Sequence, residues 1–179
     1  QVPDAGSYSV VVSNPAGSVT SANAVLTVNV PPTISAQPQS LAVNQGGDAA
    51  FTVVAAGTAP LSYQWRLNGA NIAGATSSVY TRTGVLAGDA GSYTVLVANV
   101  AGSVASAAAV LTVNVPPSIT TQPQGQAVNQ GATATFTVSA TGTSPLTYQW
   151  RFNGANLAGA TGSSYARSGV QPADAGAYS

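Results

Sequence analysis

The sequence predicts an all-β protein built from tandem β-sandwich repeats, and three observations lead to this prediction. Apolar and polar residues alternate with a period of two in segments such as 51–55 and 63–67, as in strands with one buried face. Turn signals rich in Gly, Pro and Asn separate these short runs, which is typical of sandwiches. The pattern also recurs along the chain, because 31–94 and 116–179 share 41 identical residues of 64.

The repeat has a period of 85 residues and divides the chain into three parts. Residues 31–115 form a complete repeat. Residues 1–30 match 86–115 at 21 of 30 positions, so we expect them to supply strands F and G of a preceding repeat. Residues 116–179 are expected to supply strands A to early F of a following one. This phase indicates either a segment of a longer array or a subunit whose ends complete each other.

The alternation and the turn signals predict the strands of the complete repeat in order. Asn68-Gly69 joins two alternating runs and is a strong signal for a two-residue hairpin turn. The β-branched and aromatic content of the later runs favours strands as well. We expect a first edge strand at 33–36 that continues at 40–43, B at 48–55, C at 61–67, a short C′ or D region at 70–77, E at 78–83, F at 92–98 and G at 103–113.

Three motifs give this pattern a resemblance to a known family. They are Phe51-Thr52-Val53, Trp65 twelve residues later, and the Asp-x-Gly-x-Tyr motif that ends at Tyr93. Together they resemble the immunoglobulin frame, and they are most similar to the I-set-like tandem repeats of bacterial exported and cell-surface proteins. In that frame Val53 and Val95 stand where antibody domains have disulfide cysteines, so the chain resembles the cysteine-free variant. The resemblance implies immunoglobulin-like β-sandwich repeats.

The aromatic residues are expected to build the core. In this frame the Trp of strand C packs between the sheets, and the Tyr at the start of strand F bonds backbone at the preceding turn. An alternative is that the Trp residues are carbohydrate platforms, but the remaining aromatics fall on inward-facing positions and leave no stacking surface. The expected core residues are Val53, Trp65, Tyr93 and Val95, with Val138 and Trp150 in the following repeat.

Two Arg residues predict a structural ion pair in each repeat. Arg82 shares strand parity with Tyr80, so we expect both side chains to point inward. A buried guanidinium needs a carboxylate partner, and Asp89 lies just beyond the intervening turn. The same pair recurs as Arg167 and Asp174. A ligand-binding role for the Arg residues is the less favoured alternative.

The composition excludes most kinds of chemistry. The chain has no Cys, His, Met, Lys or Glu, and four Asp and four Arg give a net charge of zero. Without thiolate, imidazole or clustered carboxylates, we expect no catalysis, no metal site and no cofactor. The absence of clustered cations predicts no nucleic-acid partner. No apolar run is long enough for membrane insertion, and a targeting segment is expected to lie outside residues 1–179 because 1–4 do not resemble one.

The joints between repeats carry the functional prediction. Pro31-Pro32 and Pro116-Pro117 connect strand G to the next strand A without a Gly/Ser spacer, and such joints are semi-rigid. We therefore expect a rod-like tandem array that serves as the shaft of an extracellular or cell-surface stalk, fibre or adhesin. Its partners would be adjacent repeats or neighbouring copies, head to tail.

The alternative is an adhesive or carbohydrate-binding module of a cell-surface protein or secreted enzyme. Such a module would act through the loops at 56–60, 70–77 and 99–102. These loops are short, rich in small residues and similar between repeats, which argues against specific recognition. The sequence names no surface ligand.

Overall fold

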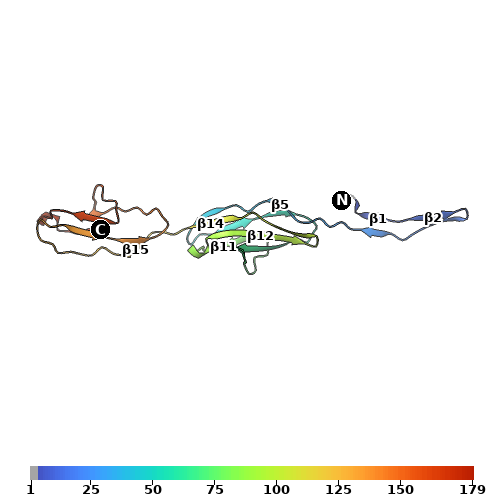
Figure 1. The fold of residues 1–179 in the computed structure, drawn as a ribbon, viewed down its shortest axis with the longest axis horizontal. Helices are drawn as coiled ribbons and strands as arrows, with labels where there is room; N and C mark the ends of the chain where they lie inside the picture. Colours follow the sequence, from blue (N-terminus) through green and yellow to red (C-terminus); the bar gives the residue numbers. More distant parts are fainter. Residues whose placement is uncertain (1–3) are drawn as a thin grey trace. The chain divides into compact units, whose positions relative to one another are not determined.

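The computed structural model describes residues 4–179 (Figure 1). The chain divides into two compact units, Gln1–Val113 and Asn114–Ser179. The first unit contains a hairpin, followed by a complete repeat that begins at Pro31. Regular structure in the described residues consists of strands and short 3-10 turns.

The complete repeat is built from ten strands and one 3-10 turn. Its strands are short and rich in Val, Ala and aromatic residues, which favour the extended backbone. The elements are β5 (Thr33–Ala36), β6 (Leu41–Asn44), β7 (Ala49–Thr52), β8 (Val54–Ala56), β9 (Ser62–Leu67), β10 (Ala70–Asn71), β11 (Val79–Arg82), η2 (Ala87–Asp89), β12 (Gly91–Asn99), β13 (Gly102–Ala105) and β14 (Ala109–Asn114).

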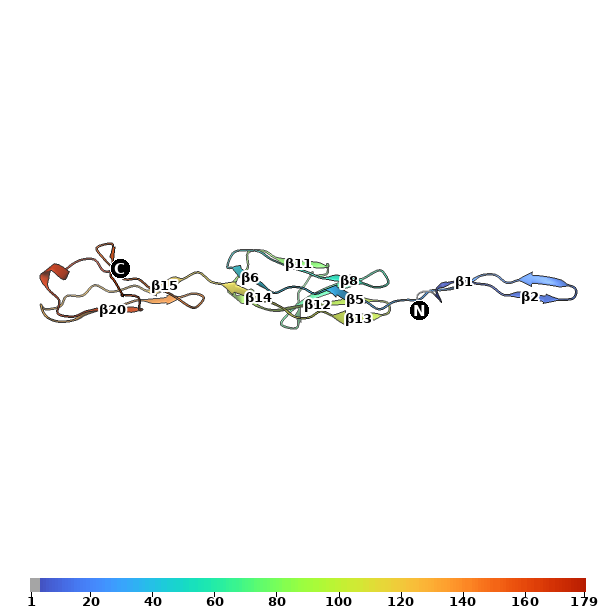
Figure 2. The same cartoon turned by 90° about the horizontal axis from the view of Figure 1, so that it is seen from above.

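These strands form the two layers of a sandwich. One layer has the strand order β10-β9-β12-β14-β6, with β13 also paired to β12. The other layer consists of the antiparallel pairs β7–β11 and β5–β8. Figure 2 shows β8 and β11 on one side of this repeat and β12 and β13 on the other. Burial alternates residue by residue along β7 and β14, so one face of each strand points into the space between the layers.

The predicted hairpin turn at Asn68-Gly69 is confirmed. Both residues have positive φ values, 49° and 84°, and Leu67 pairs with Ala70 across the turn. Asn and Gly adopt these left-handed angles at lower cost than other residues, which explains the turn.

The prediction that G is a single strand from 103 to 113 is wrong. The segment breaks into β13 and β14, and Ser106 lies buried at the break. Its N–H donates to Val95 O (2.9 Å), and its Oγ accepts the Val95 N–H (3.0 Å) and donates to Ala107 O (2.8 Å). A side chain thus replaces part of the ladder, and β12 pairs with β13 at one end and with β14 at the other.

Strand B is also divided, at Val53. β7 pairs with β11 and β8 pairs with β5, so the two halves of the predicted strand face different neighbours. Val53 N donates to Ser78 O (3.0 Å) at the break. Of the predicted C′ or D region at 70–77, only the two residues of β10 form a strand.

The hairpin that precedes the complete repeat has four short strands. β1 (Gly6–Tyr8) pairs with β4 (Ala24–Leu26), and β2 (Val11–Asn14) pairs with β3 (Gly17–Thr20) (blue in Figure 1). Its sequence corresponds to β12, β13 and β14. Every residue from 4 to 27 is exposed, although the corresponding β12 and β14 of the complete repeat each bury one face.

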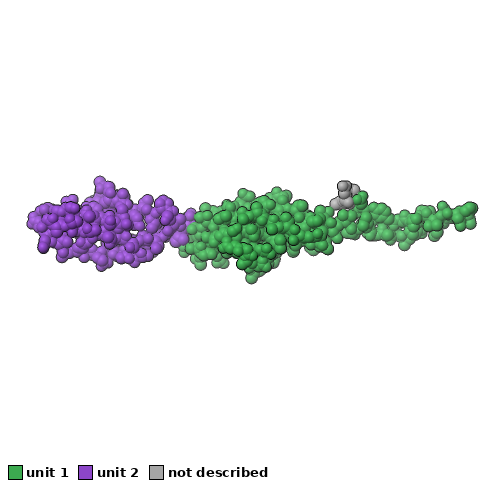
Figure 3. All heavy atoms as spheres, in the orientation of Figure 1, with its two compact units in different colours: residues 1–113 green, residues 114–179 purple. Residues whose placement is uncertain are grey.

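The second unit (purple in Figure 3) repeats only part of the sandwich. Its pairs β15–β17, β16–β20 and β18–β19 match β5–β8, β7–β11 and β9–β10 of the complete repeat. The elements are β15 (Ser118–Thr121), β16 (Ala134–Thr137), β17 (Ser139–Thr141), β18 (Arg151–Phe152), β19 (Ala155–Asn156), β20 (Ser164–Arg167) and η3 (Pro172–Asp174).

Two strands of the complete repeat are lost or shortened in this unit. Residues 126–129, which correspond to β6, form no strand, and β18 has two residues where β9 has six. In the complete repeat β6 lies beside β14, and β9 pairs with β12. Residues 116–179 include only the first residues of the β12 counterpart and not the β14 counterpart, so within these residues both edges are without the strands that pair with them in the complete repeat.

The core of the complete repeat surrounds Trp65. Val53, Trp65, Tyr93 and Val95 are each at most 2% exposed and lie in one buried cluster. Phe51 stacks on Tyr93 with ring centroids 4.5 Å apart, and the Trp65 indole N–H donates to Ser77 O (2.9 Å). In the second unit Trp150 is buried and Val138 is partly buried against the same kind of cluster. The indole N–H is therefore satisfied inside an apolar interior, as stability requires.

Replacing Trp65 with Ala should lower the free energy of unfolding of the complete repeat by about 3–5 kcal/mol, because it leaves a large cavity between the layers. Urea denaturation followed by circular dichroism measures this change. Val110→Ala, at a half-exposed position on β14, serves as the control and should cost less than about 0.5 kcal/mol. Equal midpoints for the two variants would contradict this description of the core.

Candidate functional site: the joints between repeats

Outside the joints, the described residues include few side chains that could form a metal, membrane or sugar-binding site. Within 4–179, no group of three or more His, Cys, Asp or Glu residues is placed to hold a metal ion. None of the helices in that range has the length and apolar character needed to cross a bilayer. The two Trp side chains are 0% and 3% exposed, so neither presents a face on which a sugar could stack. The joints are where hydrogen bonds, glycines and prolines converge.

The first joint holds Val30, the residue before Pro31-Pro32, by both of its backbone groups. Val30 N donates to Thr58 Oγ1 (2.7 Å), and Thr58 N donates to Val30 O (3.0 Å). The Asn99 side chain donates from Nδ2 to Val30 O (2.7 Å) and to Thr58 O (2.9 Å). The end of the incoming strand is thus attached to two loops of the complete repeat. We call this set of hydrogen bonds the joint clamp.

A glycine lets the prolines approach the clamp closely. Gly57 has a φ of 156°, and a Cβ at this position would lie 3.0 Å from Pro32 Cα and 3.2 Å from Pro31 O. Both distances are shorter than an ordinary carbon contact, and side chains rarely adopt this φ. Gly57 is therefore required for this packing, in which Pro32 is buried.

The second joint repeats the clamp 85 residues later. Val115 N donates to Thr143 Oγ1 (2.7 Å), and Thr143 N donates to Val115 O (2.9 Å). A Cβ on Gly142 would lie 3.0 Å from Pro117 Cα and 3.1 Å from Pro116 O. The position that corresponds to Asn99 falls beyond residue 179. The recurrence shows that the clamp belongs to the repeat and is not a local accident.

Sequence reasoning identified the four prolines but missed Gly57, Thr58 and Asn99. The recurrence of these residues could have pointed to them, since Gly57-Thr58 recurs unchanged as Gly142-Thr143 and Asn99 matches Asn14. Recurrence alone does not show which residues touch, because the Asn99 side chain bonds to Val30 across 69 residues of sequence, and a local sequence pattern cannot predict such a contact.

The two Arg residues pair with the expected Asp residues, but they are only partly buried. Arg82 Nε lies 3.0 Å from Asp89 Oδ1, and Arg167 Nη2 lies 2.8 Å from Asp174 Oδ1. The Arg82 side chain is 42% exposed, although its Nε is buried at the end of β11. The guanidinium is therefore only partly buried, short of the full burial that was predicted. At Nε the contact is an ion pair without hydrogen-bond geometry.

Residues 31–99 and 116–179 match the family model described as the immunoglobulin domain. The chain belongs to the immunoglobulin domain family. Its sandwich also superposes on the titin I-band fragment I67-I69 with a TM-score of 0.80, at 24% identity, over 99% of this chain and 69% of that one.

Three curated relatives share immunoglobulin-domain sequence with the chain. Roundabout homolog 1 of Mus musculus is 35% identical over 84% of the chain, and Hemicentin-1 of Homo sapiens is 33% identical over 84%. Endoglucanase C of Cellulomonas fimi is 32% identical over 69% of the chain. The chain spans only 3% to 12% of the length of these relatives.

The immunoglobulin domain closes its turn before β12 with a tyrosine and a carboxylate. Tyr93 OH donates to Asp89 O (2.8 Å), and Asp89 Oδ2 accepts the Leu86 N–H (2.8 Å). The Leu86 N–H, and after it Arg82, hold the pKa of the Asp89 carboxyl below its usual value, against the opposing effect of burial. At Asp174 the Gln171 N–H and then Arg167 lower the pKa in the same way. Burial raises the pKa of Tyr93.

These lowered pKa values predict a loss of stability in acid. Because the folded pKa lies below the unfolded one, the stabilisation from Asp89 is complete above the unfolded value of about 3.9 and is lost as the pH falls through the folded value. Urea denaturation over a pH series should therefore show decreasing stability below about pH 4. Asp89→Asn should be less stable at neutral pH and should show a smaller acid loss; an unchanged pH slope would contradict this role.

Proposed function

We propose that the chain is a structural segment of an exported stalk, fibre or adhesin shaft, in which clamped proline joints connect successive immunoglobulin domains without a flexible spacer. It performs no catalysis in this proposal. The observation that carries it is the joint clamp, which holds the residue before Pro-Pro by both backbone groups at two joints one repeat apart.

The clamp leaves a joint with few free backbone angles. Proline fixes φ at two successive residues and biases the preceding residue toward extended geometry. At the first joint four hydrogen bonds then attach Val30 and Thr58 to each other and to Asn99. Each is worth about 1 kcal/mol, so bending that breaks the set is unfavourable. A linear array of domains gains a defined length from such joints.

The remaining surface supports a passive role. Four Asp and four Arg in 179 residues provide no charged patch to attract a ligand over distance. An extracellular or cell-surface location is part of the proposal. It is supported by the resemblance to cysteine-free repeats of bacterial exported proteins and by the similarity to Roundabout homolog 1 and Hemicentin-1, which are cell-surface or extracellular proteins.

A second candidate is an adhesive or carbohydrate-binding module of a cell-surface protein or secreted enzyme, which the similarity to Endoglucanase C favours. Three loops could serve this role. Two of them, 56–60 and 99–102, contain Thr58 and Asn99 and are engaged in the joint clamp. The loop at 70–77 takes no part in the clamp, although several of its backbone groups bond to β9 and to the Trp65 and Gln64 side chains. A glycan array probed with the 179-residue chain tests this candidate, and specific binding abolished by changes in 70–77 would establish it.

Removing the clamp should make the joints flexible. The double variant Thr58→Val, Thr143→Val deletes the accepting hydroxyl at each joint with little change in side-chain volume. Small-angle X-ray scattering should then report a broader distribution of maximum dimensions than for the parent chain. Thr81→Val, at an exposed strand position, is the matched control and should leave the distribution unchanged. Identical profiles for the parent and the double variant would contradict the proposal.

A further inference from the structure

The hairpin turn between β9 and β10 contains a reactive pair of residues. Only two Asn residues of the chain precede a Gly, Asn68 and Asn153, and they occupy the same position of the repeat. Asn68 and Gly69 are both exposed, and Gly69 lies outside the paired residues of β9 and β10. Because Gly has no Cβ, its backbone nitrogen is less shielded than that of other residues. The Gly69 nitrogen is therefore open to approach by the Asn68 side chain.

An Asn side chain that precedes Gly can lose its amide without an enzyme or an oxidant. The Gly69 nitrogen attacks Asn68 Cγ, the new C–N bond closes a succinimide ring, and the Cγ–Nδ2 bond breaks. The leaving group departs as ammonia, with the proton that the Gly69 nitrogen gives up. Water then opens the ring at either carbonyl group and leaves aspartate or isoaspartate. The reaction consumes only water, but the Asn68 side chain must turn toward the Gly69 nitrogen.

In the folded repeat the Asn68 side chain is engaged in another contact. Asn68 N donates to Ser92 O (2.8 Å), and Asn68 Oδ1 accepts the Ser92 N–H (2.9 Å). We call these two hydrogen bonds the turn tie. They attach the exposed turn to the beginning of β12, beside the buried Tyr93. The carbonyl group that the Gly69 nitrogen would attack is thus bonded to a neighbouring strand.

A second glycine keeps the space for the turn tie free. A Cβ on Gly91 would lie 2.7 Å from Asn68 Oδ1 and 2.8 Å from Asn68 Nδ2. Both distances are shorter than an ordinary contact, so a side chain at this position would displace the Asn68 amide from Ser92. Gly91 is therefore the position at which the tie can be disturbed without changing either residue of the turn.

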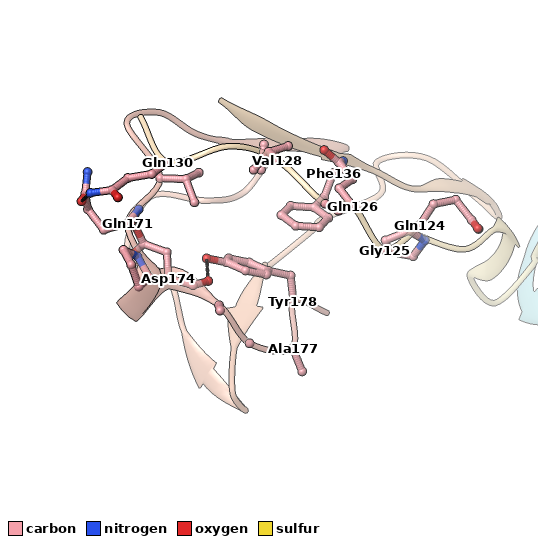
Figure 4. A pocket seen from close by; sticks show the side chains of 17 residues that line it. Gln124, Gly125, Gln126, Val128, Gln130, Phe136, Gln171, Asp174, Ala177 and Tyr178 are labelled. Atoms are coloured by element: carbon pink, nitrogen blue, oxygen red, sulfur yellow. Dashed lines mark hydrogen bonds between the residues drawn. The ribbon is translucent and has the colours of Figure 1, made fainter. Parts of the chain in front are cut away.

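The turn tie recurs one repeat later. Asn153 N donates to Ala177 O (2.8 Å), and Asn153 Oδ1 accepts the Ala177 N–H (3.0 Å). A Cβ on Gly176 would lie 2.7 Å from Asn153 Oδ1. Figure 4 shows Ala177 next to Tyr178, whose hydroxyl group donates to Asp174 O (2.9 Å). The tie therefore accompanies the tyrosine turn in both units.

We propose that Asn68 and Asn153 are sites of spontaneous deamidation, and that the turn tie controls the rate by holding each side-chain amide away from the nitrogen of the following Gly. The reactive state is the locally opened turn. When opening and closing are fast compared with the chemical step, the rate follows the population of the open state. Deamidation therefore measures how much of the time the turn of each repeat is open.

The two products have different effects on the repeat. Aspartate at position 68 keeps an oxygen that can accept the Ser92 N–H. Isoaspartate leads the main chain through the former side chain and adds a methylene group between residues 68 and 69. The two-residue turn then no longer fits the pairing of Leu67 with Ala70. Formation of isoaspartate should therefore loosen the end of the β9–β10 hairpin.

Mass spectrometry of the full 179-residue chain during incubation in buffer tests the proposal. Trypsin cleaves after the four Arg residues, so Asn68 and Asn153 are recovered in separate peptides, 67–82 and 152–167. Gly91→Ala should raise the deamidation rate at Asn68 at least about tenfold, which corresponds to about 1.4 kcal/mol in activation free energy. The rate at Asn153 in the same molecules is the internal reference and should not change.

Val97→Ala is the matched control for a general loss of stability. Val97 is completely buried further along β12, so its truncation destabilises the repeat without touching the turn tie. The rate at Asn68 should stay close to that of the parent chain. Circular dichroism shows whether both variants are folded under the conditions of the incubation. Equal acceleration at Asn68 by Gly91→Ala and Val97→Ala would overturn the proposal.

The parent chain provides a second test that requires no variant. In urea that unfolds the repeat, Asn68 should deamidate at least about tenfold faster than in buffer, equivalent to about 1.4 kcal/mol. It should also react faster than Asn71, which precedes Ile72 in the same peptide. Equal rates at Asn68 in buffer and in urea, or a rate in urea no higher than that of Asn71, would refute the assignment.

Discussion

The pairing of β12 with its neighbours on both sides is the interaction on which each sandwich depends. The two repeats of the chain make this visible. Where β12 and β14 are present, β6 and β9 are full strands and Trp65 is completely buried. In residues 116–179, which include only the beginning of these two strands, 126–129 forms no strand and β18 has two residues. Since the two sequences are nearly two-thirds identical over the shared region, the missing partner strands are the physical reason for the difference.

The joint depends on the same strand pair. β14 and the segment before Val30 lead directly into Pro-Pro. In the first joint the clamp attaches Val30 to Thr58, in the loop between β8 and β9, and to Asn99 at the end of β12. Gly57 permits the prolines to pack against these loops. The repeat has few side chains that could act in catalysis or ligand binding, and Gly57, Thr58 and Asn99 instead form the joint that precedes it.

Much of the fold could be predicted from the sequence, and the limits have physical causes. The period-two alternation and the Asn68-Gly69 turn depend on local residues, so they predicted the layers and the hairpin. The break in strand G depends on the hydrogen bond between the buried Ser106 hydroxyl and the Val95 N–H. The alternation of apolar and polar residues does not predict this bond. Strand parity placed the Arg82 Nε in a buried position beside Asp89, but it could not show that the side chain as a whole stays 42% exposed.

The joint shows the same limit at longer range. The prolines were evident as a motif, whereas the clamp requires Thr58 and Asn99 to meet Val30 through the fold. The most direct measurement is amide hydrogen exchange at Val30 and Val115, resolved by NMR. The account predicts that both amides exchange slowly. Their opening free energies should be close to those of their clamp partners, Thr58 N–H for Val30 and Thr143 N–H for Val115. Exchange at the rate of an unstructured peptide at Val30 and Val115 would contradict a clamped joint.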